Sequence, residues 1–523
     1  MRGFSFLSFS PGVEDMNSKT KFFQSGMMLT AVALAMRTVS MFFGAFVTAA
    51  VGTEGTGLYT IVMTVYSFAV TFATSGISLT VTRLVASAIG EGVRSVSSVL
   101  RSALVYAMLF GISASLILFF GADFLGEHIL FDQRSTLSLK VLSFSLVPIA
   151  LGSVFSGYFV GVKRVGFNAS VQVLAQIAKI ALTVILVIKM AAEGVASAVA
   201  ALCLGITATE IFAFGLIFCE YLYDRKKTRR EGEKKSDEMG EVVKTALPIA
   251  FSAYVRSALL TLEHILIPRR LMYRGESSGE AYSNYGLLHG MALPVVTYPM
   301  SPLSSFSGLL VPEFAEDMSA GRHRRMDRIA TSALNTTLTY AIAIGALIYS
   351  FSEELGYVIY HSYDVGQYIS MLAPVIPIMY LDHVTDSMLK GIGEQVFSMW
   401  VNITDSLLSV ILVWLLIPVM GISGYAIVIV IMEGYNFLLS FLRLKSKIKF
   451  KLDIKRAAII PLAASAVASY LADFLFKFSG SSVRPLWLIF KMLFSVAITV
   501  FLISLTKIKS VRAEKGIENY GNT

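Results

Sequence analysis

Long apolar segments, each near the length that crosses a lipid bilayer, follow one another along most of this 523-residue chain. A helix of about 20 apolar residues crosses roughly 30 Å of hydrocarbon. Fourteen segments meet that length: Ser25–Val51, Gly57–Leu79, Ser97–Gly121, Leu139–Val162, Ala169–Ile188, Gly194–Leu222, Val242–Ile267, Ser283–Val311, Ile329–Phe351, Tyr368–Leu389, Val396–Val419, Ile422–Leu442, Ala457–Phe476 and Leu486–Thr506. Backbone groups in lipid need internal partners, and the segments lack the short alternation of barrel strands, so we predict an all-α polytopic membrane protein with 14 transmembrane helices.

A repeat about 230 residues apart divides these helices into two sets. The stretch Val147–Arg164 returns as Ile376–Glu394, with prolines and glycines in register to within one residue. RLVASAIGEG from Arg83 is matched by EFAEDMSAG from Glu313. Repeated multi-helix units are typical of transporters with a central cavity. We therefore expect two six-helix lobes in a pseudo-two-fold repeat, followed by a C-terminal helix pair.

This organisation predicts six parts of the chain. They are an N-terminal segment at residues 1–24, an N-lobe at 25–222, a basic linker at 223–241, a C-lobe at 242–445, the C-terminal helix pair at 446–507 and a tail at 508–523.

Basic residues are concentrated in loops on one predicted side of the membrane. The net charge of +9 comes largely from segments such as RKKTRREGEKK from Arg225 and RLKSKIKFKLDIKR from Arg443. Because cytoplasmic loops are enriched in Lys and Arg, both termini are predicted to be cytoplasmic. These loops favour anionic phospholipids as partners, and we expect no nucleic acid.

Two arginines lie near the middle of predicted spans at matched positions, Arg37 in the first helix and Arg256 in the seventh. A central arginine costs roughly 2.5–3.5 kcal/mol on insertion scales, so each needs a reason to be there. Each could pair with a buried acid and hold helices together. Alternatively, both could bind a crossing anion, and guanidinium forks suit phosphate oxygens. Arg83, at the inner end of the second helix, could contact the same headgroup or only reach the interface.

Acidic residues form two further candidate sets. Asp382, Asp386 and Lys390 are spaced i, i+4, i+8 and share one helical face, which suits an internal ion pair or a protonatable site. Glu263, Asn402, Asp405 and Glu433 offer hard oxygen ligands and predict a coupling-ion site for Na⁺ or H⁺. Beyond such an ion we expect no cofactor and no resident metal.

Two further features bear on mechanism. The segment from Gly290 carries Pro294, Pro299 and Pro302, so this span must bend or break, either for packing or to line a cavity. Zinc motifs, Walker loops and nucleophile elbows are not found in the sequence, so we expect a protein that is not an enzyme.

With these features in view, the sequence resembles the multidrug/oligosaccharidyl-lipid/polysaccharide (MOP, MATE-like) exporter superfamily. Within it, the chain is similar to the branch of stage V sporulation protein B and polysaccharide-biosynthesis flippases. The resemblance extends from about Lys21 to Lys507. It is carried by GISLTVTRLVASAIGEG from Gly76, LEHILIPRRL from Leu262, the proline-rich span ending in LLVPEFAEDMSAG, and PVIPIMYLDHVTDSMLKGIGEQ from Pro374.

The resemblance implies a flippase for a polyprenyl-diphosphate-linked saccharide in the bacterial inner membrane, serving peptidoglycan, spore-cortex or polysaccharide synthesis. It further implies a cationic cavity, with Arg37 and Arg256 at matching positions and Arg83 at a looser one. Glu263 departs from the aspartate that the family pattern would place before IPRRL. We expect a monomer that works by alternating access.

Three alternatives remain open on the sequence. A cation-coupled multidrug antiporter of the same superfamily would stop at 12 helices and would fit paired arginines poorly. A membrane polymerase or glycosyltransferase needs a large outer loop carrying acid and base residues, and the predicted outer loops are short. A scaffold for envelope assembly would transport nothing.

Overall fold

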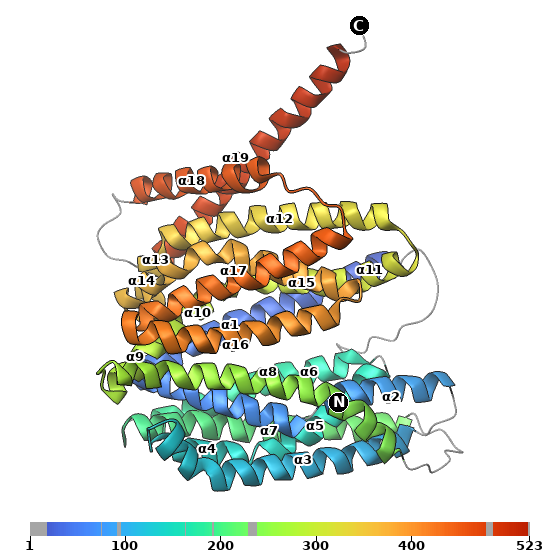
Figure 1. Cartoon of the computed structure of the whole chain (residues 1–523), viewed down its shortest axis with the longest axis vertical. Helices are drawn as coiled ribbons and strands as arrows, with labels where there is room; N and C mark the ends of the chain where they lie inside the picture. Colours follow the sequence, from blue (N-terminus) through green and yellow to red (C-terminus); the bar gives the residue numbers. More distant parts are fainter. Residues whose placement is uncertain are drawn as a thin grey trace, which may run out of the picture. The chain divides into compact units, whose positions relative to one another are not determined.

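The computed structural model describes residues 18–74, 76–91, 96–162, 164–190, 193–227, 238–476 and 485–520, and these ranges are almost entirely helical (Figure 1). Most of the predicted N-terminal segment and most of the basic linker lie outside the described residues. Two compact units are distinguished by their internal contacts. The first comprises the chain up to Gly286 except for Ser40–Ala45, and the second comprises that short stretch and the chain from Leu287 onward.

The first unit contains nine α-helices and one π-helical turn within the described residues. These are α1 (Ser18–Thr74), α2 (Ile77–Glu91), α3 (Val96–Phe124), η1 (Leu125–Ile129), α4 (Ser135–Ser143), α5 (Leu146–Gly161), α6 (Val165–Met190), α7 (Val195–Lys227), α8 (Met239–Tyr273) and α9 (Ser278–Tyr285).

The second unit is built from shorter pieces as well as long helices. Its elements are η3 (Gly286–Ala292), α10 (Leu293–Thr297), η4 (Tyr298–Met300), α11 (Ser301–Ser319), α12 (His323–Ser350), α13 (Ser352–Tyr360), α14 (Tyr363–Leu372), η5 (Ala373–Val375), α15 (Ile376–Gly391), α16 (Gln395–Met420), α17 (Ile422–Lys447), η6 (Lys455–Ile459), α18 (Ile460–Phe476) and α19 (Pro485–Tyr520).

Ten helical runs in the described ranges are long and apolar enough to cross a membrane, or eleven if the α4–α5 pair, bent by 43°, forms one span. The protein is therefore a multi-pass membrane protein. The fourteen predicted segments exceed this number for local reasons. The first two segments fall within one helical run, which is kinked at Gly52, where φ is 74°. The predicted spans Ser283–Val311 and Tyr368–Leu389 are broken into pieces.

The proline-rich span is broken, which confirms the predicted bend. It starts with a π-helical stretch at Gly286–Ala292, continues through α10 and a 3₁₀ turn at Tyr298–Met300, and becomes regular again in α11. Pro294, Pro299 and Pro302 each lie at the first turn of one of these pieces. A missing N–H is tolerated at a first turn, so each proline starts a new helical piece.

The sequence repeat corresponds to a repeated helix crossing. In the first unit, a side chain at Gly161 of α5 would meet the backbone oxygen of Thr82 and the Cβ of Val85, both at 3.0 Å. In the second unit, a side chain at Gly391 of α15 would meet the Val311 backbone oxygen at 2.8 Å and the Phe314 Cβ at 2.7 Å. Small residues let helix backbones approach closely in membranes. The two crossings, α2 with α5 and α11 with α15, are thus built in the same way.

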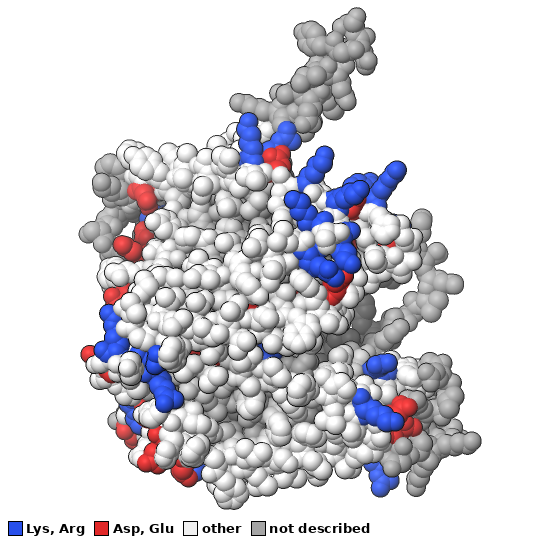
Figure 2. Space-filling view, viewed as in Figure 1, with Lys and Arg blue, Asp and Glu red and all other residues white. Residues whose placement is uncertain are grey.

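Charged side chains gather towards the ends of the helices, and the middle of the face drawn in Figure 2 is nearly free of them. This distribution is what a membrane-spanning helical protein requires, because charges are costly in hydrocarbon. Ion pairs join the chain at several helix ends. Arg164, just before α6, forms an ion pair with the buried Asp224 at the end of α7, and Tyr158 donates to Asp224 Oδ2 at 2.7 Å.

Candidate functional site

The three arginines predicted to bind substrate lie in the first compact unit. Arg256 is exposed on α8, and the structure gives it no ion pair with a described residue. Arg83 is exposed on α2. Arg37 lies in α1, but its side chain is outside the described residues. The helix that carries Arg256, which the repeat assigns to the second lobe, packs against α2 and α3 of the first unit.

Helix α8 contacts α1 through a row of polar side chains near Arg256. The Tyr254 hydroxyl donates to the Phe72 carbonyl oxygen, and the Ser257 hydroxyl donates to the Thr71 hydroxyl, both at 3.4 Å. Thr261 continues the row towards the other end of the helix, donating to the Thr64 carbonyl oxygen at 3.4 Å. Successive helical residues point about 100° apart, so Arg256 lies beside this row and not within it. The row fixes the rotation of α8 and leaves the guanidinium exposed.

Glu263 is buried on α8, with 8% of its surface exposed. Its neighbour His264 shares a hydrogen bond with the fully buried Tyr285 hydroxyl, at 3.1 Å from Nδ1. Glu263 also interacts electrostatically with Tyr285. Glu263 thus belongs to the first unit, whereas Asn402, Asp405 and Glu433 belong to the second. The four residues of the predicted ion site are not gathered within one compact unit.

Three carboxylates from three helices of the second unit lie within range of one another's charge. They are Asp382 of α15, Asp405 of α16 and Glu433 of α17. The side-chain amide of Asn402 instead donates to the Ser398 carbonyl oxygen of its own helix, at 2.7 Å. These three acidic residues therefore come from both acidic sets predicted from the sequence.

The remaining members of the Asp382 set form an ion pair. Lys390 Nζ lies 2.6 Å from Asp386 Oδ2, one helical turn apart on α15. The Asp386 carboxylate also interacts electrostatically with Asp382. Among the described residues, no group of three His, Cys, Asp or Glu side chains is disposed to hold a metal ion.

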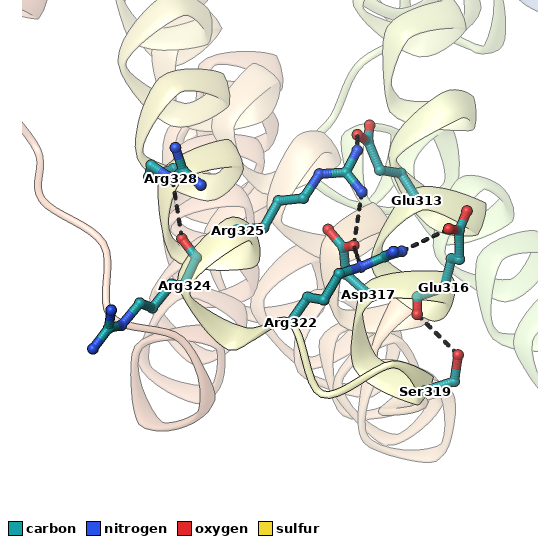
Figure 3. A network of polar contacts seen from close by, with 8 residues as sticks. All are labelled: Glu313, Glu316, Asp317, Ser319, Arg322, Arg324, Arg325 and Arg328. Atoms are coloured by element: carbon teal, nitrogen blue, oxygen red, sulfur yellow. Dashed lines mark hydrogen bonds and ion pairs between the residues drawn. The ribbon is translucent and has the colours of Figure 1, made fainter.

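A second network joins α11 to α12 at the end of the broken span (Figure 3). Asp317 is completely buried, and its Oδ1 accepts from Arg322 Nε at 2.6 Å and from Arg325 Nη1 at 2.8 Å. Glu313 and Glu316 complete the network, each with one arginine partner. A buried carboxylate held by two guanidinium groups loses several kcal/mol of stabilisation if a partner is removed. This network fixes the turn between the two helices.

Sequence reasoning did not find some of these partners. It placed Asp382 apart from Asp405 and Glu433, although the three carboxylates interact electrostatically. It also left Arg164 and Asp224 unassigned, although Arg164 occupies the repeat position of Glu394. The repeat was the available signal. Residues at matching positions of the two copies, such as Arg164 and Glu394, are expected to make equivalent contacts.

Comparison with known proteins identifies the family. The family model for polysaccharide biosynthesis protein matches residues 22–318, which is more than half of the chain. The chain belongs to this family. A second family model, MatE, matches residues 289–415. Both place the chain in the MOP superfamily, whose members are transporters and not enzymes, as expected from the sequence.

Two relatives have sequence similarity to the chain. Stage V sporulation protein B of Bacillus subtilis (strain 168) is 25% identical over 422 residues, covering 79% of this chain and 81% of that protein. Sporulation protein YkvU of the same organism is 20% identical over 240 residues, covering 45% of this chain and 54% of that protein.

Solved structures share the fold. The lipid II flippase MurJ in an inward closed conformation superimposes with a TM-score of 0.70 at 14% identity, covering 92% of this chain and all of MurJ. An inward-facing multidrug resistance MATE transporter of the MOP superfamily gives a TM-score of 0.61 at 15% identity, covering 80% of this chain and 98% of the transporter. The chain thus has a MurJ- and MATE-like fold.

Proposed function

We propose that this transporter moves a polyprenyl-diphosphate-linked saccharide, a peptidoglycan precursor or a polysaccharide repeat unit, across the bacterial inner membrane by alternating access. The observation that carries the proposal is the extent of the MurJ-like fold. MurJ matches 92% of the chain and the MATE transporter 80%, a difference of about 12%. That share is close to the size of the predicted C-terminal helix pair at residues 446–507. A helix pair beyond the MATE core suits a substrate with a long lipid tail.

The architecture proposed with this function has 14 crossings. The long run Thr38–Ile89 counts as two spans, divided at Gly52, and the broken segments Ser283–Val311 and Tyr368–Leu389 count as one each. Broken helices at membrane depth are tolerated where they line protein or a wet cavity. Basic loops at Arg225 and Arg443 favour cytoplasmic termini, and the chain is proposed to act as a monomer.

In this mechanism Arg256, Arg37 and Arg83 bind the diphosphate of the headgroup. The exposure of Arg256 supports its role, because its guanidinium has no ion pair with a described acid and is available to a phosphate oxygen. Charge-assisted hydrogen bonds of this kind contribute about 1.5–3 kcal/mol each. The prenyl chain remains in the lipid while the headgroup crosses.

The energy for the cycle is proposed to come from Na⁺ or H⁺ through the second unit. Asp382, Asp405 and Glu433 repel one another when all are charged, so binding of one cation or proton stabilises the group. Asn402 of the same unit remains a candidate contributor, and Asp386 with Lys390 would set the local charge. In this proposal, a change in the charge of these carboxylates triggers movement of α15 to α17.

The test is transport by the purified chain in proteoliposomes that contain a fluorescent polyprenyl-diphosphate saccharide. Arg256→Ala should lower the rate by about 10- to 100-fold, the equivalent of one lost charge-assisted bond. Arg101→Ala, at an exposed arginine near the start of α3, is the matched control and should transport at the normal rate. Normal transport by Arg256→Ala would contradict the diphosphate role, and failure of the intact chain to move any such lipid would contradict the function.

A second candidate is cation-coupled drug export, which the MatE match at residues 289–415 favours. The same vesicles loaded with a cationic dye distinguish the two. Dye export that is unaffected by Arg256→Ala, without movement of lipid-linked saccharide, would support the antiporter.

A further inference from the structure

A short extended segment at residues 448–453, here called the basic strap, is fastened along α12 of the second unit. The strap follows α17, and its first residue, Ile448, has φ −129° and ψ 135°. Three backbone amides of the strap donate to side-chain oxygens spaced four residues apart on α12. The bonds run from Lys449 to Asp327, Lys451 to Thr331 and Asp453 to Asn335, at 2.9, 3.3 and 2.8 Å.

The pattern follows from the geometry of the two elements. Four residues of α-helix rise about 6.0 Å, and two residues of extended chain span about 6.6 Å, so every second amide meets one helical turn. Asn335 also donates to the Lys451 carbonyl oxygen at 2.8 Å. Phe450 packs against Phe441, with ring centroids 5.2 Å apart. Because the backbone makes the bonds to α12, the side chains of Lys449 and Lys451 are left exposed.

Most other cations in this part of the unit are already neutralised. Arg322 and Arg325 have acidic partners on α11. Arg443 and Lys447 both pair with Glu394, at 2.7 and 2.9 Å. Lys449, Lys451 and Arg328 have no ion pair with any described residue, and the same holds for Arg324, Lys445 and Lys455. Figure 2 shows Lys and Arg side chains gathered where α12 meets the connection from α17 to α18.

Lys449, Lys451 and Arg328 border a surface cavity of about 470 Å³. The cavity is also lined by the exposed hydroxyl groups of Ser332 and Thr336 on α12. Asp327 is the acidic residue of the lining, and its Oδ1 already accepts from the Lys449 amide. Three cations with hydroxyl donors form a favourable environment for a phosphate group.

Apolar side chains next to the strap point to a lipid as the source of that phosphate. Ile454, directly after the strap, is 62% exposed, and Leu442 on α17 and Ile459 at the end of η6 are 52% and 59% exposed. Cations beside exposed aliphatic side chains match the boundary between headgroups and acyl chains. A soluble phosphate would gain nothing from the apolar residues.

We propose that the basic strap and α12 form a binding site for the phosphate headgroup of an anionic glycerophospholipid, separate from the arginines assigned to the transported substrate. The site holds the lipid phosphate between Lys449, Lys451 and Arg328, with its acyl chains along the apolar neighbours. The orientation proposed above, with cytoplasmic termini, places this lipid in the inner leaflet. The rest of the proposal does not depend on that orientation.

The test is native mass spectrometry of the full chain with phosphatidylglycerol or phosphatidylcholine of the same acyl chains. The variant Lys449→Gln/Lys451→Gln should bind phosphatidylglycerol about 5- to 30-fold more weakly, since each surface cation contributes about 1 kcal/mol towards an anionic lipid. Phosphatidylcholine binding should be unchanged. The charge-conserving Lys449→Arg/Lys451→Arg variant should retain phosphatidylglycerol, and the amides that fasten the strap are present in both variants.

The matched control is Lys244→Gln/Arg101→Gln, which removes two exposed cations elsewhere on the same proposed side of the membrane. An equal loss of phosphatidylglycerol in this control would overturn the site in favour of a general charge effect. Equal retention of the two lipids by the unchanged chain would overturn it as well. If inorganic phosphate displaced bound phosphatidylglycerol as strongly as added phosphatidylglycerol does, the assignment of a lipid as the ligand would be overturned.

Discussion

Arg164 and Glu394 make the same tertiary connection with opposite charges. Each ends one copy of the repeated stretch and directly precedes a helix, α6 for Arg164 and α16 for Glu394. Arg164 pairs with Asp224 at the end of α7, and Glu394 pairs with Arg443 near the end of α17 at 2.7 Å. The two copies thus make the same connection with opposite polarity, and we infer that its role is to hold two helix ends together.

This relationship predicts that the charges of the first pair can be exchanged. Arg164→Glu alone should destabilise the chain by about 3 kcal/mol, because it leaves the 3%-exposed Asp224 carboxylate facing a like charge. The double variant Arg164→Glu/Asp224→Arg should recover most of the loss, since an acid before α6 also suits the helix N-terminus. Thermal unfolding of the detergent-solubilised protein measures this. A double variant no more stable than the single one would contradict the interpretation.

The two glycine crossings should differ in their tolerance of a methyl group. At Gly391 an added Cβ would lie 2.7 Å from Phe314 Cβ, whereas the nearest contacts at Gly161 are 3.0 Å. Overpacking typically costs about 1–3 kcal/mol, so Gly391→Ala should lie at the upper end and Gly161→Ala at the lower. Gly121→Ala on α3 is the control, because no atom lies within 4 Å of its Cβ position. It should be neutral or slightly stabilising in the same unfolding assay, given the helix propensity of alanine.

Glu394 should make stability depend on pH. Lys447 and Arg443 hold the pKa of the Glu394 carboxyl below its usual range. A lowered folded-state pKa stabilises the fold above the unfolded value of about 4.3, and the contribution disappears as the pH falls through the folded pKa. Glu394→Gln should therefore be less stable than the unchanged chain at pH 7, with the difference shrinking below about pH 4. A difference that stays constant down to pH 3 would exclude this origin.

The strap should be released by changing one side chain of α12. Asn335 makes two bonds to it, to the Lys451 carbonyl oxygen and from the Asp453 amide. Asn335→Ala should raise hydrogen exchange in a peptide covering residues 448–454 by roughly 5- to 10-fold, the equivalent of about 1 kcal/mol. Ser332→Ala, one turn away and exposed, should leave exchange unchanged. Equal exchange in both variants would show that Phe450 and its neighbours hold the strap without these bonds.

Much of the fold could be predicted because lipid imposes strict local rules. The helical class, the bend at Pro294, Pro299 and Pro302, and the interruption between the first two segments all follow from apolar length and backbone chemistry. The family could likewise be inferred from the order of its motifs. The number of continuous spans could not, since Gly52 and the two broken segments decide where one span ends and the next begins.

The sequence by itself determined that this chain is a helical membrane transporter with a repeated plan, because an unsatisfied backbone is so costly in hydrocarbon that apolar length specifies helices. The tertiary structure alone decided which side chains meet. Spacing along one helix shows that Asp382 and Asp386 share a face, but only packing brings Asp382 to Asp405 and Glu433. Likewise, only packing places α8 against the first unit and the strap on α12, because these contacts depend on the rotation and neighbours of each helix.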